Sequence, residues 1–322
     1  MSKYGLSFLL LIGLWAMTST GMQSDLGSWS SAANMPTARK QITNSVVSLN
    51  GEIYVLGGVD SSGNITDAVE VYNPQSNTWR NTTPMPVKLW RTMVAVVNEK
   101  LYMMGGYRST GSFPFSPTRE VFEYDPANDT WTAKASLPGP RGMGAAVVLD
   151  GNIHLLAGAF SNALRDHLIY DPQTDKWSDG PSLIGVRSGL AAGVIDGRIY
   201  AVGGYRLQSG VFSQKTVEMF DPNTNEWTSV ADLPDTRHGI SAAVINDKLY
   251  VFGGLPVAVE THSFVYDPSS DTWAELADMP SGLTMAGAAA VDGTIYVLGG
   301  GVSGLGRTDG VNLNQAFVPP SE

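Results

Sequence analysis

The sequence predicts an all-β protein, a propeller of six blades with four antiparallel strands each, because two features recur about every fifty residues. One feature is an aromatic residue followed two positions later by proline and seven positions later by tryptophan; the other is a glycine pair. The aromatic residues are Tyr72, Tyr124, Tyr170, Phe220 and Tyr266, and the tryptophans are Trp79, Trp131, Trp177, Trp227 and Trp273. With Trp29 included, successive tryptophans are 50, 52, 46, 50 and 46 residues apart.

The glycine pairs keep the same phase as the tryptophans. They are Gly57-Gly58, Gly105-Gly106, Gly203-Gly204, Gly253-Gly254 and Gly299-Gly300, with Ala157-Gly158 in the third unit. A residue without Cβ allows close backbone approach and positive φ, so these positions predict a tightly packed bend.

Each unit is expected to form four strands. The first is an apolar run such as residues 145–149, closed by a tight turn such as Asp150-Gly151. The second ends at the glycine pair. The third carries the aromatic residue and stops at Asp-Pro or Asn-Pro, because proline lacks the donor for a sheet hydrogen bond. The fourth carries the tryptophan, and no helical period separates the strands.

The last unit, about residues 288–319, supplies only three strands, with Phe317 and Pro319 at the aromatic and proline positions. Trp29 precedes the first complete unit and has no preceding strands of its own. We therefore expect the N-terminal strand to complete the sixth blade and close the ring, which removes exposed sheet edges.

The repeat resembles the Kelch family closely. The resemblance rests on residues 187–190, 199–204 and 217–222 together with Trp227, and it extends over roughly residues 27–320. Ala157 and the missing tryptophan after the last glycine pair depart from the pattern. The resemblance implies a propeller, and Kelch propellers of animal adaptor proteins use arginines to hold acidic peptides.

Residues 1–21 have the form of a secretory signal peptide, and residues 22–322 are expected to form a single propeller domain. Lys3 is followed by an uncharged segment, residues 5–17, and then by small residues. The chain contains no cysteine, so it has no disulfide and no thiolate ligand. We expect a periplasmic or extracellular monomer that is not inserted in the membrane after signal cleavage.

The composition of the chain excludes several classes of partner and of catalytic site. The net charge of −10 disfavours nucleic acid and anionic membranes. Four histidines, His154, His167, His238 and His262, are expected in different units without ligand spacing, so we expect no metal and no cofactor. Copper oxidases on Kelch-like propellers use a cysteine-modified tyrosine, and the absence of cysteine excludes that class.

The pattern in the sequence that indicates a binding site is a set of arginines at a recurring position. Ten residues after the tryptophan stand Arg39, Arg141, Arg187 and Arg237; the second unit has Leu89 there, with Arg91 two residues further, and the sixth has Leu283. Placed at the start of the innermost strand, these arginines are expected to line one mouth of the channel. Tyr107-Arg108 and Tyr205-Arg206 follow glycine pairs and are expected on the same face.

Two readings of the arginines remain open. They either tie loops by pairing with carboxylates and carbonyls, or form an anion-binding ring, because guanidinium groups bind carboxylates in a bidentate manner.

The functional hypothesis is a secreted binding module for an anionic small molecule, such as a carboxylated sugar, or an acidic peptide or protein. The alternative is a sialic-acid mutarotase, which needs a general acid/base carboxylate beside such an arginine, and no Glu is assigned that role by spacing. A third possibility is a scaffold whose partner is specified by its loops.

Overall fold

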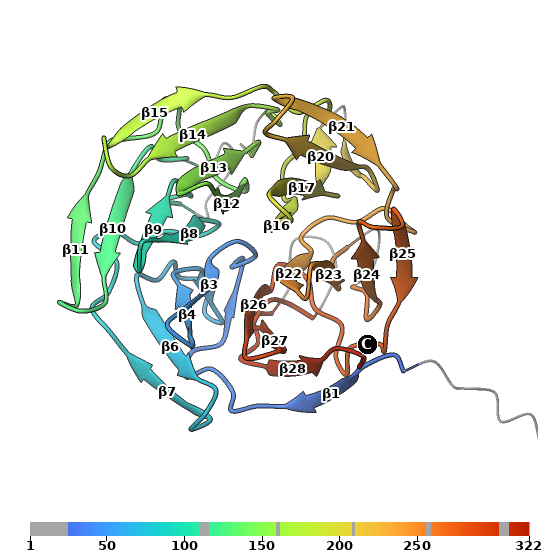
Figure 1. Ribbon diagram of the computed structural model, residues 1–322. Helices are drawn as coiled ribbons and strands as arrows, with labels where there is room; N and C mark the ends of the chain where they lie inside the picture. The colour runs from blue at the N-terminus through green and yellow to red at the C-terminus, as the bar shows by residue number, and fades with distance from the viewer. Residues whose placement is uncertain are drawn as a thin grey trace, which may run out of the picture.

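The computed structural model describes residues 25–109, 116–158, 162–207, 210–255, 259–302 and 309–321. Six four-stranded antiparallel sheets surround a central channel like the blades of a propeller (Figure 1). The predicted fold class is confirmed. The expected signal peptide lies outside the described residues.

Each blade runs from an innermost to an outermost strand. Blade 1 contains β3 (Val46–Leu49), β4 (Glu52–Leu56), β6 (Val69–Asn73) and β7 (Thr78–Asn81); blade 2 contains β8 (Met93–Val97), β9 (Lys100–Met104), β10 (Val121–Asp125) and β11 (Thr130–Ala133). Blade 3 contains β12 (Ala145–Leu149), β13 (Asn152–Leu156), β14 (His167–Asp171) and β15 (Lys176–Asp179); blade 4 contains β16 (Ala191–Ile195), β17 (Arg198–Val202), β20 (Val217–Asp221) and β21 (Glu226–Val230). Blade 5 contains β22 (Ser241–Ile245), β23 (Lys248–Phe252), β24 (Ser263–Asp267) and β25 (Thr272–Glu275); blade 6 contains β26 (Gly287–Val291), β27 (Thr294–Leu298), β28 (Asn314–Val318) and β1 (Ser28–Ser31).

Two short strand pairs lie outside the blades. β2 (Arg39–Lys40) pairs with β5 (Val59–Asp60), and β18 (Tyr205–Leu207) forms a hairpin with β19 (Val211–Ser213). The first pair joins the segment before an innermost strand to the loop after a second strand. We call the side of the ring where these segments meet the upper face, and the opposite side, with the turns between first and second strands, the lower face.

The N-terminal strand closes the ring, as predicted. β1 lies antiparallel to β28, with Trp29 opposite Phe317, so the first and last strands of the described chain share blade 6 (Figure 1). The indole of Trp29 donates a 2.9 Å hydrogen bond to the carbonyl of Ala277, next to the outermost strand of blade 5. Trp79 and Trp131 donate in the same way to Ala33 and Thr83 of the preceding blades. The repeated tryptophan is therefore an outer link between neighbouring blades.

The glycine pairs form a second set of links. The N–H of the second glycine donates to the carbonyl of the residue ten positions after the tryptophan of its own blade, in the segment that leads into the next blade. Gly106 of blade 2, for example, donates to Arg141, which precedes blade 3, at 2.8 Å. A Cβ on Gly203 would lie only 2.8 Å from the carbonyl oxygen of Arg237, which explains the absence of a side chain there. In the third unit, where Ala157 carries a Cβ, the equivalent bond from Gly158 is longer, at 3.2 Å.

A third set of links surrounds the channel at the upper face, formed by residues twelve positions after each tryptophan. We call these residues the axial ring; they all have positive φ, and they are Gln41, Arg91, Met143, Gly189, Gly239 and Met285. Each ring amide from Arg91 to Met285 donates to the carbonyl of the preceding ring residue, at 2.8–3.2 Å. The amide of Ile42 donates to Met285 at 3.0 Å and closes the circle.

The apolar core fills the spaces between blades. In one cluster Leu56 and Val71 of blade 1 pack on Val94, Leu101 and Met103 of blade 2. No helix in the described ranges is long and apolar enough to cross a lipid bilayer.

Candidate binding site

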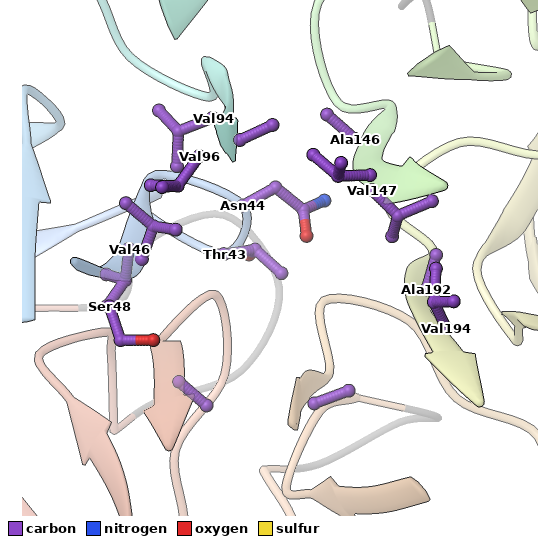
Figure 2. A pocket seen from close by; sticks show the side chains of 15 residues that line it. Thr43, Asn44, Val46, Ser48, Val94, Val96, Ala146, Val147, Ala192 and Val194 are labelled. Carbon is purple, nitrogen blue, oxygen red and sulfur yellow. The ribbon is translucent and has the colours of Figure 1, made fainter. Parts of the chain in front are cut away.

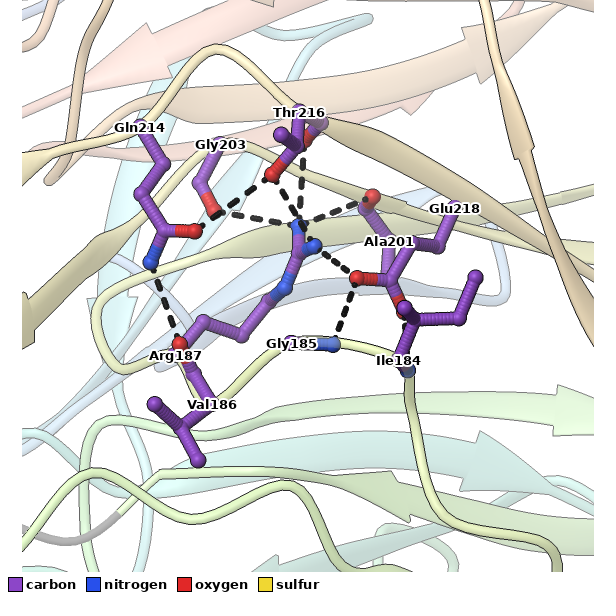
Figure 3. Close-up of polar contacts among 9 residues, drawn as sticks. All are labelled: Ile184, Gly185, Val186, Arg187, Ala201, Gly203, Gln214, Thr216 and Glu218. Carbon is purple, nitrogen blue, oxygen red and sulfur yellow. Dashed lines mark hydrogen bonds and ion pairs between the residues drawn. The ribbon is translucent and has the colours of Figure 1, made fainter.

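Arg187 shows where the repeated arginines point. Its side chain is fully buried, and its guanidinium lies inside blade 4 rather than in the channel (Figure 3). Nη1 donates to the carbonyls of Gly203 (3.3 Å) and Thr216 (3.1 Å), at the bend between the second and third strands. Nη2 forms an ion pair with the buried carboxylate of Glu218. Burial lowers the pKa of the guanidinium, and Glu218 partly offsets the shift.

Glu218 in turn accepts from the amides of Ile184 (2.8 Å) and Gly185 (3.0 Å), in the segment that enters the blade. Arg187 and Glu218 therefore tie the entering segment to the glycine bend. Arg39 repeats the arrangement in blade 1, with its guanidinium on the Gly57 carbonyl and the Glu70 carboxylate.

Two further blades keep the arginine and change its partner. Arg141 reaches Asp166, at 3.1 Å, because Leu168 occupies the position of Glu218. Arg237 binds Asp235, at 2.6 Å from both Nε and Nη2, and stacks on the ring of Phe264. The guanidinium is thus neutralised within its own blade in each case.

The remaining two blades replace both members of the pair. Blade 2 has Leu89 at the arginine position and Phe122 at the Glu218 position, while blade 6 has Leu283 and Gln315. Leu89 and Leu283 are buried. Where the arginine is absent the carboxylate is absent too, as expected for a buried charge that needs a partner.

The expected convergence of the arginines at the channel mouth is therefore wrong for Arg39, Arg141, Arg187 and Arg237. The prediction extended the side alternation of the innermost strand back to the arginine position. The left-handed residues of the axial ring lie between that position and the strand, and they interrupt the extended backbone. The side chains consequently turn outwards into the blades.

Arg91 occupies a different position from the other four arginines, because it belongs to the axial ring. Its Nε donates to the side-chain carbonyl of Gln41 at 2.5 Å, and its guanidinium lies 4.7 Å above the ring of Trp90. The guanidinium also contacts the sulfur of Met143. Burial lowers the pKa of Arg91, and the phenols of Tyr205 and Tyr107 oppose that shift.

No carboxylate in the described part of the chain lies within ion-pair distance of Arg91. The loop segments outside the described ranges, 110–115, 159–161, 208–209, 256–258 and 303–308, contain no Asp or Glu in their sequence. Arginine stays charged at every accessible pH. Arg91 is therefore a cation near the axis without an acidic partner among the described residues.

Aromatic side chains surround this cation on the upper face. Trp90 forms an antiparallel backbone β-bridge with Tyr107, and Ser188 forms one with Tyr205. Both tyrosines therefore lie on the upper face, as expected. Tyr107 packs on Trp90 with the two rings tilted by 44°, and Tyr205 lies edge-on to His238. His238 contacts the hydroxyl of Ser213 at 2.8 Å, and burial lowers its pKa to about 4, with Arg91 adding to the shift.

The other two predicted site residues, Arg108 and Arg206, lie on the exposed surface. Arg108 is exposed and forms an ion pair with Glu120, and Arg206 is exposed on the β18–β19 hairpin opposite Phe212. Gln41, Trp90, Met143 and His238 were not among the predicted site residues. Gln41 and Met143 stand twelve residues after a tryptophan, and Trp90 and His238 stand eleven residues after one. The residue types at both positions differ too much between units to reveal a pattern.

The expectation that the four histidines lie in different units is wrong for His154 and His167, which both belong to blade 3. Nδ1 of His154 lies 2.7 Å from Nε2 of His167, so one nitrogen donates to the other. The pair packs on Phe220 and Trp227 of blade 4. Burial lowers the pKa of both histidines to about 4. No group of three or more His, Asp or Glu suited to a metal occurs among the described residues.

Comparisons with known proteins place the chain in a family. The model for the KLHDC2/KLHL20/DRC7 Kelch-repeats domain matches residues 22–204, which is more than half of the chain. The chain belongs to the Kelch-repeat family. Two further Kelch motifs match residues 187–234 and 236–280, and together these matches cover most of the propeller.

Curated Kelch relatives match over parts of their length. Kelch-like protein terF of Aspergillus terreus is 38% identical over 122 residues, covering 36% of this chain and 27% of that protein. Beta-scruin of Limulus polyphemus is 36% identical over 133 residues, covering 41% and 14%. Kelch-like protein 35 of Mus musculus is 32% identical over 131 residues, covering 40% and 21%. The matched part thus spans about a quarter or less of each relative.

The solved structure of YjhT has the same fold as this Kelch propeller. The two structures superimpose with a TM-score of 0.74 over 88% of this chain and 96% of that one, at 16% identity. Identity at this level shows the fold alone.

The buried arginines of this Kelch propeller predict a stability experiment. Arg187→Leu leaves the Glu218 carboxylate buried without its cation, which should cost about 3–5 kcal/mol in urea unfolding. Adding Glu218→Phe copies the Leu89 and Phe122 pair of blade 2 and should recover most of the loss. Arg198→Leu, at a side chain 36% exposed, is the control with little expected effect. A single Arg187→Leu variant as stable as the native protein would refute the structural role.

The histidine pair predicts a pH dependence. His154 and His167 are neutral in the fold, with pKa values lowered to about 4, whereas unfolded histidine titrates near 6.5. The unfolded chain therefore binds more protons below pH ~6.5, and the free energy of unfolding should fall as the pH drops from there towards 4. His154→Tyr with His167→Val, the residues of blades 1, 2 and 4, should flatten that slope, leaving the part due to His238. Equal slopes in denaturant titrations of both proteins contradict this assignment.

Proposed function

We propose that this Kelch propeller is a non-catalytic binding module whose ligand presents a carboxylate to Arg91 on the upper face. The supporting observation is the contrast between the half-buried Arg91 and the four buried arginines. Arg39, Arg141, Arg187 and Arg237 have carboxylate partners within their blades, whereas Arg91 has none among the described residues. A ligand carboxylate fits the charge that the protein leaves unbalanced, and guanidinium favours such bidentate partners.

The surroundings of Arg91 favour an anion with an apolar or flat part. The almost fully buried rings of Trp90, Tyr107 and Tyr205 pack beside the guanidinium, and His238, whose pKa is lowered to about 4, is neutral above that pH. Low local polarity strengthens an ion pair relative to water. Arg206, exposed on the neighbouring hairpin, extends the positive charge outward. An acidic peptide or a carboxylated sugar is therefore the proposed ligand class.

The sialic-acid mutarotase hypothesis uses the same anion site but requires a catalytic group beside it. Opening a sugar hemiacetal needs a general acid/base group next to the bound carboxylate. The described residues place no Asp or Glu within ion-pair distance of Arg91. Binding without catalysis is thus the better supported proposal, and exchange of sialic-acid anomers followed by NMR distinguishes the two.

Export to the periplasm or the extracellular space remains part of the proposal. It rests on the uncharged segment 5–17 behind Lys3 and on the small residues that follow it. A mature native chain that begins at Met1 or Ser2 would contradict export.

Binding to Arg91 is tested with two carboxylate probes, hexaglutamate and N-acetylneuraminate, by isothermal titration calorimetry. Replacing Arg91 by Gln removes a charge-assisted contact worth ~1.5–3 kcal/mol, so affinity should fall about ten- to a hundredfold. Preference for one probe distinguishes a peptide from a sugar ligand.

The matched control is Arg198→Gln, which removes the same charge on the lower face, beside Asp221. It should leave affinity unchanged. If neither probe binds the native protein, or if Arg91→Gln binds as tightly as the native protein, the proposed site is wrong.

A further inference from the structure

The central channel contains a cavity of about 420 Å³, separate from the Arg91 site (Figure 2). Its walls are small aliphatic side chains from the innermost strands of all six blades, among them Val47, Val96, Val148, Val194, Ala242 and Ala288. This volume falls in the range of small-molecule sites.

Asn44 closes the upper end of this cavity. Its side chain reaches into the middle of the channel (Figure 2), where Nδ2 donates to the carbonyls of Gly144 (2.6 Å) and Leu190 (3.1 Å) in blades 3 and 4. Its main-chain carbonyl accepts from Val94 of blade 2 at 2.9 Å. Thr43 and Asn44 also line the small cavity beside Arg91, so they form the partition between the two spaces. A ligand of the channel must therefore enter from the lower face.

The composition of the walls restricts what can occupy the cavity. No charged side chain lines it, and the polar side chains there are those of Thr43, Asn44 and Ser48. A charged group inside would lose its hydration without an ionic partner. The buried part of a ligand must consequently be an uncharged, slender chain.

Exposed carboxylates are distributed around the lower face. The turns that follow the innermost strands carry an exposed acidic residue in five of the six blades: Glu99, Asp150, Asp196, Asp247 and Asp292. Asp196 has a side chain 86% exposed, and its nearest cation, Arg198, is 3.5 Å away. This arrangement attracts cations and repels anions, in agreement with the net charge of −10.

We propose that the channel binds an aliphatic chain with a cationic head group, an alkylammonium ion. The chain lies against the valines and alanines of the innermost strands, and the ammonium stays hydrated among the acidic turns of the lower face. This ligand class is the opposite in charge to that proposed for Arg91, so the two proposals succeed or fail independently.

Calorimetric titration with n-octylammonium, n-octanol and n-octanoate, each below its micellar concentration, tests the assignment. We expect one-to-one binding that is tightest for the ammonium and weakest for the carboxylate. Between butyl- and octylammonium the affinity should rise about fourfold per methylene, the value for burying a CH₂ group. Equal binding of the three head groups, or affinity independent of chain length, overturns the proposal without any variant.

Filling the channel provides a second test. Ala242→Leu with Ala288→Leu places two larger side chains in the cavity and should reduce the affinity for octylammonium at least tenfold. Ala274→Leu makes the same change on an exposed position of β25 and should leave the affinity unchanged. Retained affinity in the channel variant, or equal loss in the control, shows that octylammonium binds elsewhere.

Discussion

The structure depends on a circle of six backbone hydrogen bonds at the channel axis, five between left-handed residues and a sixth from Ile42 to Met285. Because Gln41, Arg91, Met143, Gly189, Gly239 and Met285 share this conformation, each blade donates one amide to the carbonyl of its neighbour before its innermost strand begins. Four of these six residues are neither glycine nor asparagine, so they adopt positive φ at an energetic cost. The closed circle, together with the glycine and tryptophan links further out, offsets that cost.

The axial ring also divides the molecule functionally. Above it, Arg91 is the ring residue with a charge, and aromatic side chains from neighbouring blades surround it. Below it, Asn44 lies across a channel lined by small aliphatic side chains, which opens towards the lower face with its acidic turns. The two proposed sites thus share a boundary of two residues, Thr43 and Asn44, while their preferred ligand charges are opposite.

The sequence predicted the six blades, the order of strands and the closure by Trp29, because tryptophan and glycine are required at fixed positions by links between blades. It failed at the arginine side chains, since one left-handed residue between Arg187 and strand β16 changes the side on which they project. The axial ring was not predictable by composition, because its members share a backbone conformation and not a residue type. The pair of His154 and His167 needed the register of β13 and β14, in which His154 lies opposite Ile169 and therefore diagonally across from His167.

Native-state hydrogen exchange followed by NMR tests the central role of the axial ring most directly. The account predicts that the amides of Arg91, Met143, Gly189, Gly239 and Met285 exchange with one common free energy, equal to that of global unfolding, because opening one bond breaks the circle. Individual, rapid exchange of these amides, while the amides of the innermost strands stay protected, would contradict it.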